Sequence, residues 1–283
     1  MQLRRIVVAS DDSREGQAAL VAAARLSQRC RSRVTALTVL EMGYDEAVTA
    51  QAVQGLTARV TAAMGLFPNA PKIEAEVAFG LPGVEIGRFA ENRSADLVVV
   101  GRKRRTELQR RLLGDTADAV ARRSGTPCLF VTAGDLDFGR VLVALDGTER
   151  GLSVLIAAMD FARLTGAKLR AVSVEPAYEN EDRVPRLLTG RSARLVEAVD
   201  GLISSSPLGR SAWDRGDRIP APPPIVIHRG PIVAEILRET EQSDADLLFI
   251  GYHRGGPAGI VDAGSVARRL THEAPCGVLT IPL

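Results

Sequence analysis

Two loops in the chain have the layout of a phosphate-binding loop. The first, GRKRRTELQRRLLGDT, runs from Gly101 to Thr116 and follows the apolar run DLVVV. The second, GYHRGGPAGIVDAGS, runs from Gly251 to Ser265. A glycine that leaves a strand lets the backbone approach an anion closely, and the N-terminus of the next helix presents free N–H groups and a partial positive charge. Both loops therefore predict a site for an anion such as a nucleotide phosphate.

The two loops differ in the charges that they would bring to a phosphate. In the first, Asp115 opens the helix, and at ~4 Å and an effective dielectric of about 20 its carboxylate would repel a phosphate by on the order of 4 kcal/mol. In the second, Ser265 stands there, and its hydroxyl group can donate a hydrogen bond. Each loop also carries an arginine, Arg104 or Arg254, that either fills the phosphate cavity or binds a phosphate as a bidentate donor. The second loop is the better candidate, and the first predicts a degenerate site.

The chain contains two copies of one pattern. The clearest matches are IVVASDDS with VLVALDGT (6–13 and 141–148) and DLVVVGRKR with DLLFIGYHR (96–104 and 246–254). The first pair is offset by 135 residues and the second by 150, so the second copy carries a net insertion of 15 residues. We place this insertion in the stretch 204–224, which is rich in Ser, Gly and Pro. The repeat predicts two domains, at 1–134 and 139–283, joined by a short linker.

Within each copy, apolar runs alternate with amphipathic segments. In the first copy the runs predict strands at Leu3–Ala9, Arg33–Leu40, Lys72–Phe79, Asp96–Val100 and Cys128–Thr132. Apolar residues at helical spacing predict helices at Ser13–Arg29, Asp45–Leu66, Pro82–Arg93 and Asp115–Arg123, with N-caps at Ser13 and Asp115. The continuous runs IVVA and LVVV favour strands covered on both faces, as in a parallel sheet. Each copy is therefore predicted to be a doubly wound, Rossmann-like α/β domain.

Ligands of such sheets bind at the carboxyl ends of the strands, where the strand order reverses. The first strand of each copy ends near an aspartate, Asp11 or Asp146, and the second ends near a valine, Val39 or Val174. The aspartates either contact a ligand or cap the helix that follows them. The valines either contact a ligand or belong to the core. His253 lies in the second loop, where it would approach a ligand.

These motifs resemble those of the universal stress protein family, over nearly the whole chain except 204–224. The resemblance implies a five-stranded, mainly parallel sheet of order 3-2-1-4-5 in each copy, with the last strands of the copies paired as an internal pseudo-dimer. The family's nucleotide-binding members carry a loop of the form G-x2-G-x9-G-[S/T]. They also have an aspartate after the first strand and a hydrophobic residue after the second, which contact ribose and adenine. The resemblance thus implies binding of ATP or AMP, with Mg²⁺ if the ligand is ATP.

The family's site residues can be placed on this chain position by position. In the second copy they imply a nucleotide site at Asp146, Val174, Gly251, Arg254, Gly264 and Ser265. We add His253 to this site because it lies in the same loop. In the first copy they imply a degenerate site at Asp11, Val39, Gly101, Arg104, Gly114 and Asp115. In both copies an arginine replaces the middle glycine of the loop. Only in the first copy does an aspartate replace the final Ser or Thr.

The composition excludes several other classes of protein. With 46% apolar and 25% charged residues the chain reads as globular, and a net charge of +2 is too small to favour nucleic-acid binding. No apolar run reaches the 18 residues of a membrane span, and the three cysteines lack metal-ligand spacing, so no metal site is predicted. We expect a cytoplasmic protein. A homodimer is favoured if the last strand of a copy stays exposed. The basic residues of Arg102–Arg111 form either a solvated face or a surface for an acidic partner.

No catalytic arrangement emerges from the sequence, because it has neither a nucleophile elbow within a Ser–His–Asp order nor a Walker lysine. The leading hypothesis is a non-enzymatic regulatory protein whose second copy binds an adenine nucleotide, and the family resemblance implies a role in stress response. One alternative is a slow ATP hydrolase or an ATP-gated switch. A second alternative is a nucleotide-free scaffold whose basic loop binds an acidic protein.

Overall fold

A computed structural model of the chain describes residues 1–41, 45–103, 116–134, 136–176, 197, 201, 223–252 and 265–283. Its strands are β1 (Arg5–Ala9), β2 (Arg33–Leu40), β3 (Ile73–Phe79), β4 (Leu97–Gly101), β5 (Cys128–Val131), β6 (Arg140–Leu145), β7 (Lys168–Glu175), β8 (Ile225–Arg229), β9 (Leu247–Tyr252) and β10 (Gly277–Pro282). Its helices are α1 (Arg14–Cys30), α2 (Glu46–Gly65), α3 (Pro82–Asn92), α4 (Thr116–Arg123), α5 (Glu149–Thr165), α8 (Ile232–Gln242) and α9 (Ser265–Glu273). The predicted α/β alternation is confirmed, and each element predicted for the first copy ends within two residues of its observed bounds.

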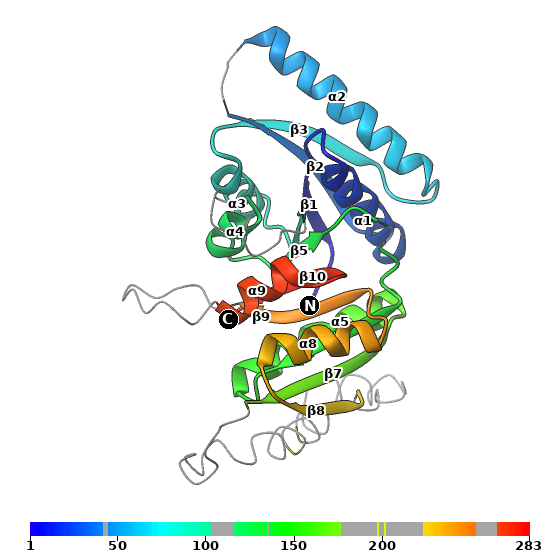
Figure 1. The fold of residues 1–283 in the computed structure, drawn as a ribbon. Helices are drawn as coiled ribbons and strands as arrows, with labels where there is room; N and C mark the ends of the chain where they lie inside the picture. The colour runs from blue at the N-terminus through cyan, green and yellow to red at the C-terminus, as the bar shows by residue number, and fades with distance from the viewer. Residues whose placement is uncertain are drawn as a thin grey trace.

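In the described part of the chain the strands form one ten-stranded sheet, in the order β3-β2-β1-β4-β5-β10-β9-β6-β7-β8. We call residues 1–134 the first half and residues 139–283 the second half. Each half contributes five strands in the order 3-2-1-4-5, as predicted, and every pairing inside a half is parallel. The two halves meet at the middle of the sheet, and β3 and β8 lie at its two ends (Figure 1).

Helices α1 and α5 begin where the sequence supplies a cap. The Ser13 hydroxyl oxygen accepts a hydrogen bond from the N–H of Gly16 at 3.0 Å. The Thr148 hydroxyl oxygen accepts one from the N–H of Gly151 at 3.2 Å. Such caps satisfy one of the N–H groups that the first turn of a helix leaves unpaired. The N-cap predicted at Ser13 is confirmed, whereas the one predicted at Asp115 lies outside the described residues.

Side chains along each strand alternate between the two faces of the sheet, because the side-chain period of a strand is two residues. On one face, buried residues such as Ile6, Val8 and Val99 pack beneath α1, α2 and α5. On the other face, residues such as Val7 and Val98 pack beneath α3, α4, α8 and α9. Helices thus cover both faces, which is why the central strands read as continuous apolar runs.

The two halves are joined by the last strand of each. Strands β5 and β10 pair antiparallel, with Cys128 opposite Thr280, Leu129 opposite Leu279 and Phe130 opposite Val278. Apart from Thr280 at 3% and Cys128 at 1%, these side chains are fully buried. This pairing is the internal pseudo-dimer that the resemblance implies, and it makes one continuous sheet and two continuous cores out of the two halves.

The segment between the halves is packed rather than extended into solvent. The Asp137 carboxylate accepts hydrogen bonds from Arg25 at 2.6 Å and from Arg29 at 2.9 Å, both on α1. The side chain of Phe138 is fully buried, and its ring lies edge-on to Phe161 of α5, with 5.8 Å between the ring centroids. The linker therefore fixes α1 of the first half near α5 of the second.

Two expectations about organisation remain predictions. The insertion near 204–224 lies outside the described residues except for its last two positions, Pro223 and Pro224. The domain division at 134 and 139 likewise stays a prediction, although the packed linker lies between these positions. Within the described ranges, no helix combines the length and the apolar character that crossing a membrane requires.

Replacing Phe130 by alanine is expected to destabilise the whole molecule. Phe130 is fully buried beside β10, so the substitution should lower the free energy of unfolding by about 3–5 kcal/mol. Urea unfolding followed by circular dichroism measures this loss, and Leu81→Ala, at a side chain that is 67% exposed, is the control. We expect a single transition for every variant. Two separate transitions, with only one of them moved by Phe130→Ala, would contradict a shared core.

Candidate functional site

Each half has a pocket where its strand order reverses. In the first half β1 lies between β2 and β4, and in the second half β6 lies between β7 and β9. The first pocket has a volume of about 400 Å³ and the second about 270 Å³. Both lie at the carboxyl ends of these strands, which is the position that a doubly wound sheet offers to a ligand.

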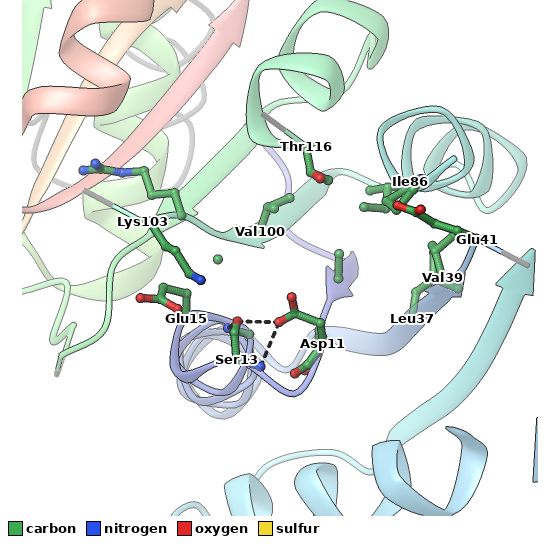
Figure 2. Close-up of a pocket in the computed structure, with 16 residues that line it drawn as sticks. Asp11, Ser13, Glu15, Leu37, Val39, Glu41, Ile86, Val100, Lys103 and Thr116 are labelled. Carbon is green, nitrogen blue, oxygen red and sulfur yellow. Dashed lines mark hydrogen bonds between the residues drawn. The ribbon is translucent and has the colours of Figure 1, made fainter. Parts of the chain in front are cut away.

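The first pocket brings together three residues that the sequence predicted for this half, Asp11, Val39 and Gly101. Two further carboxylates, from Glu15 at the start of α1 and Glu41 after β2, also line it. The side chain of Lys103 points toward the start of α1, where Ser13 and Glu15 lie (Figure 2). The first pocket is therefore polar and carries more negative than positive charge, because Arg102, which also lines it, directs its guanidinium group elsewhere.

The second pocket brings together the corresponding residues, Asp146, Val174 and Gly251. Its other walls are mostly apolar and come from α5, α8, β9 and α9: Val154, Ile232, Ile236, Ile250, Val266, Ala267 and Leu270. Of the described residues that line it, Asp146 is the only one with an ionisable side chain. The second pocket is thus a mostly apolar slot with one ionisable side chain among the described residues.

The aspartate of each pocket holds the turn that leads into the next helix. Asp146 Oδ1 accepts hydrogen bonds from the N–H of Thr148 at 3.0 Å and from its hydroxyl group at 2.7 Å. Asp11 Oδ1 makes the same pair of contacts with Ser13, and the one to the backbone N–H is 3.1 Å long. For neither aspartate does Oδ2 have a hydrogen-bond partner among the described residues. One oxygen can therefore hold the turn while the other faces a ligand, so the two roles considered for these aspartates are compatible.

Two glycines at this turn escaped the sequence reasoning. A Cβ atom on Gly16 would lie 2.5 Å from Asp11 Oδ1, and one on Gly151 would lie 2.5 Å from Asp146 Oδ1. Only a hydrogen atom fits in this space, so the glycine lets the helix start directly against the aspartate. The signal was present in both copies as the pattern D-x-[S/T]-x-x-G, read from Asp11 and again from Asp146.

The glycines that end β4 and β9 are crowded in different ways. A Cβ atom on Gly101 would lie 2.4 Å from the backbone carbonyl group of Glu15, which cannot give way. A Cβ atom on Gly251 would lie 2.5 Å from the Cδ1 atom of Leu283, the flexible end of a side chain. Gly101 is thus explained by its packing against α1. At Gly251 the neighbouring wall of the pocket can move.

Several predicted site residues lie outside the described part of the chain. In the first half these are Arg104, Gly114 and Asp115. In the second half they are His253, Arg254 and Gly264, and of Ser265 only its place at the start of α9 is described. Their roles remain predictions. Among the residues that are described, no cluster of three or more His, Cys, Asp or Glu side chains could hold a metal ion.

Arg102 corrects one expectation about the basic segment. The sequence placed Arg102 within a solvated face or a surface for an acidic partner, yet its side chain is only 2% exposed. Its guanidinium group donates to the carbonyl oxygens of Ala274 at 2.9 Å, Cys276 at 2.8 Å and His272 at 3.3 Å. Arg102 therefore belongs to the interface between the halves, because the second half offers it three backbone acceptors there.

The cysteine at the start of each half's last strand is a packing residue. Burial raises the pKa of the Cys128 thiol to about 12 and that of the Cys276 thiol to about 11. Both thiols therefore stay protonated at neutral pH, where a reactive cysteine needs the thiolate form.

Three comparisons with known proteins agree on the kind of fold. A model of the Universal stress protein family matches residues 2–132 and 137–282. The chain is 43% identical over 60 residues to a universal stress protein of Methanocaldococcus jannaschii, a stretch that covers 21% of this chain and only 35% of that protein. A crystal structure of a universal stress protein from Archaeoglobus fulgidus superposes with a TM-score of 0.70 at 18% identity, covering 100% of this chain and 99% of that one.

A protein of unknown function from Pseudomonas aeruginosa PAO1 superposes with a TM-score of 0.67 at 20% identity, covering 99% of this chain and 92% of that one. At such low identities these two structural likenesses establish the fold alone.

Replacing Gly151 or Gly16 by alanine is expected to destabilise the protein. The new Cβ atom would displace the aspartate from its turn, which should cost about 1–3 kcal/mol of unfolding free energy as an overpacked site does. Gly55→Ala in α2 is the matched control, because the nearest atom to its Cβ would be 3.5 Å away. It should instead stabilise the protein by roughly 0.5–1 kcal/mol. Urea unfolding measures the change in unfolding free energy for all three variants. If Gly16→Ala and Gly151→Ala stabilised the protein as Gly55→Ala does, the close contact between each glycine and its aspartate would be refuted.

Proposed function

Because the chain belongs to the universal stress protein family, we propose that it is a non-enzymatic regulatory protein of stress response that binds an adenine nucleotide in the second pocket. The observation that carries this proposal is the lining of that pocket, an apolar slot with Asp146 as its one ionisable side chain among the described residues. An adenine base requires apolar walls, and its ribose requires a polar group at their edge.

The dimensions of the second pocket support the nucleoside part of such a ligand. Its volume of about 270 Å³ is close to the lower end of the usual range for small-molecule sites, roughly 300 Å³. Val174 and Ile250 would contact the base, and Oδ2 of Asp146 would accept a hydrogen bond from a ribose hydroxyl group. Leu283, which lies against Gly251, can move aside because only the end of its side chain is involved.

The phosphates would extend toward the start of α9. This helix begins at Ser265, and its first residues Val266 and Ala267 line the pocket. The unpaired N–H groups of a helix N-terminus and the helix dipole both favour an anion. The sequence adds the hydroxyl group of Ser265 as a donor, and Arg254 as a cation in the preceding loop. The remaining site residues proposed are His253 and Gly264.

The first pocket supports a phosphate less well. Besides Asp11, the counterpart of Asp146, two carboxylates that the second pocket lacks line it, from Glu15 and Glu41, and Lys103 is the one cation that faces it among the described residues. At ~4 Å and an effective dielectric of about 20, each carboxylate near a phosphate would cost on the order of 4 kcal/mol. We therefore propose that the first pocket is the degenerate member of the pair.

The repeat supplies a matched pair of variants to test this assignment. Asp146→Ala and Asp11→Ala remove the same turn contacts, so we expect similar losses of stability from both. Only Asp146→Ala should weaken the binding of AMP or ATP, by about tenfold or more, since a hydrogen bond to a charged group contributes about 1.5–3 kcal/mol. Isothermal titration calorimetry gives the affinities, and thermal unfolding gives the stabilities.

Three outcomes are distinguishable. If the purified protein releases no nucleotide on denaturation and binds none at millimolar concentration, the proposal fails. If Asp11→Ala weakens binding as much as Asp146→Ala does, the assignment to the second pocket fails. Release of phosphate from bound ATP would replace the non-enzymatic function with the slow hydrolase.

A further inference from the structure

We propose that Arg102, a residue of the first half, is a positioning residue for the nucleotide pocket of the second half. Its position in the chain places it at the first pocket, between Gly101 and Lys103. Its guanidinium group crosses from the first half to the second and binds the carboxyl end of α9, a helix that lines the second pocket. The inference concerns regulation of the proposed nucleotide site, and its consequence for affinity rests on that proposed function.

The guanidinium group of Arg102 closes the carboxyl end of α9. It donates to the carbonyl oxygen of His272 in the last turn, and to those of Ala274 and Cys276 in the segment that enters β10, at distances of 3.3, 2.9 and 2.8 Å. The last carbonyl groups of a helix have no partner within the helix and carry a partial negative charge. A buried cation is costly unless it is hydrogen-bonded, and three carbonyl oxygens offset that cost here.

The same helix forms part of the second pocket. Val266, Ala267 and Leu270 of α9 line this pocket, and the helix begins at Ser265, toward which we propose that the phosphates extend. Helix α9 has nine residues, so its two ends are about 13 Å apart at 1.5 Å per residue. A short helix with one buried face moves as a unit. Holding its carboxyl end therefore fixes both the apolar wall and the N–H groups at its start.

The backbone of Arg102 is itself anchored in the first half. Its N–H donates to the carbonyl oxygen of Val131, at the end of β5, at 2.7 Å. Gly101, directly before it, packs against the backbone of Glu15. Anything that displaces the carboxyl end of β4, such as a ligand in the first pocket, acts on the residue that holds α9. Two sites that bias one element are coupled, and the coupling is reciprocal.

The position in the second half that corresponds to Arg102 carries no positive charge. With the offset of 150 residues between the copies, Tyr252 stands in the second half where Arg102 stands in the first. Tyr252 is buried, at 6% exposure, but it carries no positive charge with which to hold a helix end as Arg102 does. The first half therefore supports α9 of the second half through the positive charge of Arg102. Tyr252, at the corresponding position of the second half, offers no such charge to the first half.

The test compares Arg102→Gln with Arg25→Gln. Arg25, on α1, also contacts the linker between the halves, through Asp137 at 2.6 Å, and its guanidinium group lies over the ring of Phe67. Arg25→Gln therefore controls for a general loosening of the contacts between the two halves. We expect Arg102→Gln to weaken the binding of AMP and ATP by about fivefold or more, a typical size for coupling between sites. Arg25→Gln should change it less than twofold, and Arg102→Lys, which keeps the charge, should recover part of the loss.

Hydrogen exchange supplies a readout that needs no nucleotide. The amides of Val266–Ala274 should exchange faster in Arg102→Gln than in the wild type or in Arg25→Gln, because α9 as a whole opens more often once its carboxyl end is released. Unchanged exchange in folded Arg102→Gln would overturn the positioning role, even if wild-type protein bound no nucleotide. Faster exchange with unchanged affinity would overturn the coupling. Absence of binding to wild-type protein would refute the proposed function and the affinity claim, and the exchange result would then decide the positioning role alone.

Discussion

The antiparallel pairing of β5 with β10 joins the two halves at the middle of the sheet. Each half of this chain buries both faces of its own sheet, but its last strand would be left with unpaired backbone groups at the edge. Pairing those two edges satisfies them and places the carboxyl end of α9 within hydrogen-bond reach of Arg102, the residue that follows β4. The continuous cores, the buried Arg102 and the packed linker all follow from this arrangement, because none of these contacts could form between separated halves.

Within that frame the two pockets are built alike and lined differently. Each starts from the same turn, in which one aspartate oxygen holds a Ser or Thr and a glycine gives the helix room to begin. The backbone therefore forms an equivalent pocket at the carboxyl ends of the strands in each half. What differs is the lining, with three carboxylates in the first pocket and an apolar wall in the second. The fold fixes where a ligand can bind, and the side chains decide which chemistry is favourable there.

The sequence predicts the parts that depend on local pattern. Strand and helix bounds and the cap at Ser13 follow from apolar spacing and turn chemistry. The strand order comes instead from the resemblance to the universal stress protein family. Reasoning from local pattern misassigned Arg102, because its partners are carbonyl groups about 170 residues away in the chain. It also missed Gly16 and Gly151, whose constraint is visible only once the aspartate and the helix are placed together. The loop arginines Arg104 and Arg254 remain predictions, since they lie outside the described residues.

Fusing two copies in one chain permits an asymmetry that a symmetric dimer does not. In a two-fold dimer of identical subunits, the residue at the position of Arg102 must make the same contact on both sides of the interface. In this chain the position holds Arg102 in one half and Tyr252 in the other, so each can suit its own surroundings. Even if the first half lacks a favourable phosphate site, as we propose, it can therefore still support a site in the second. The first pocket need not be an unused remnant, because the strand end that shapes it also carries the residue that holds α9 of the second half.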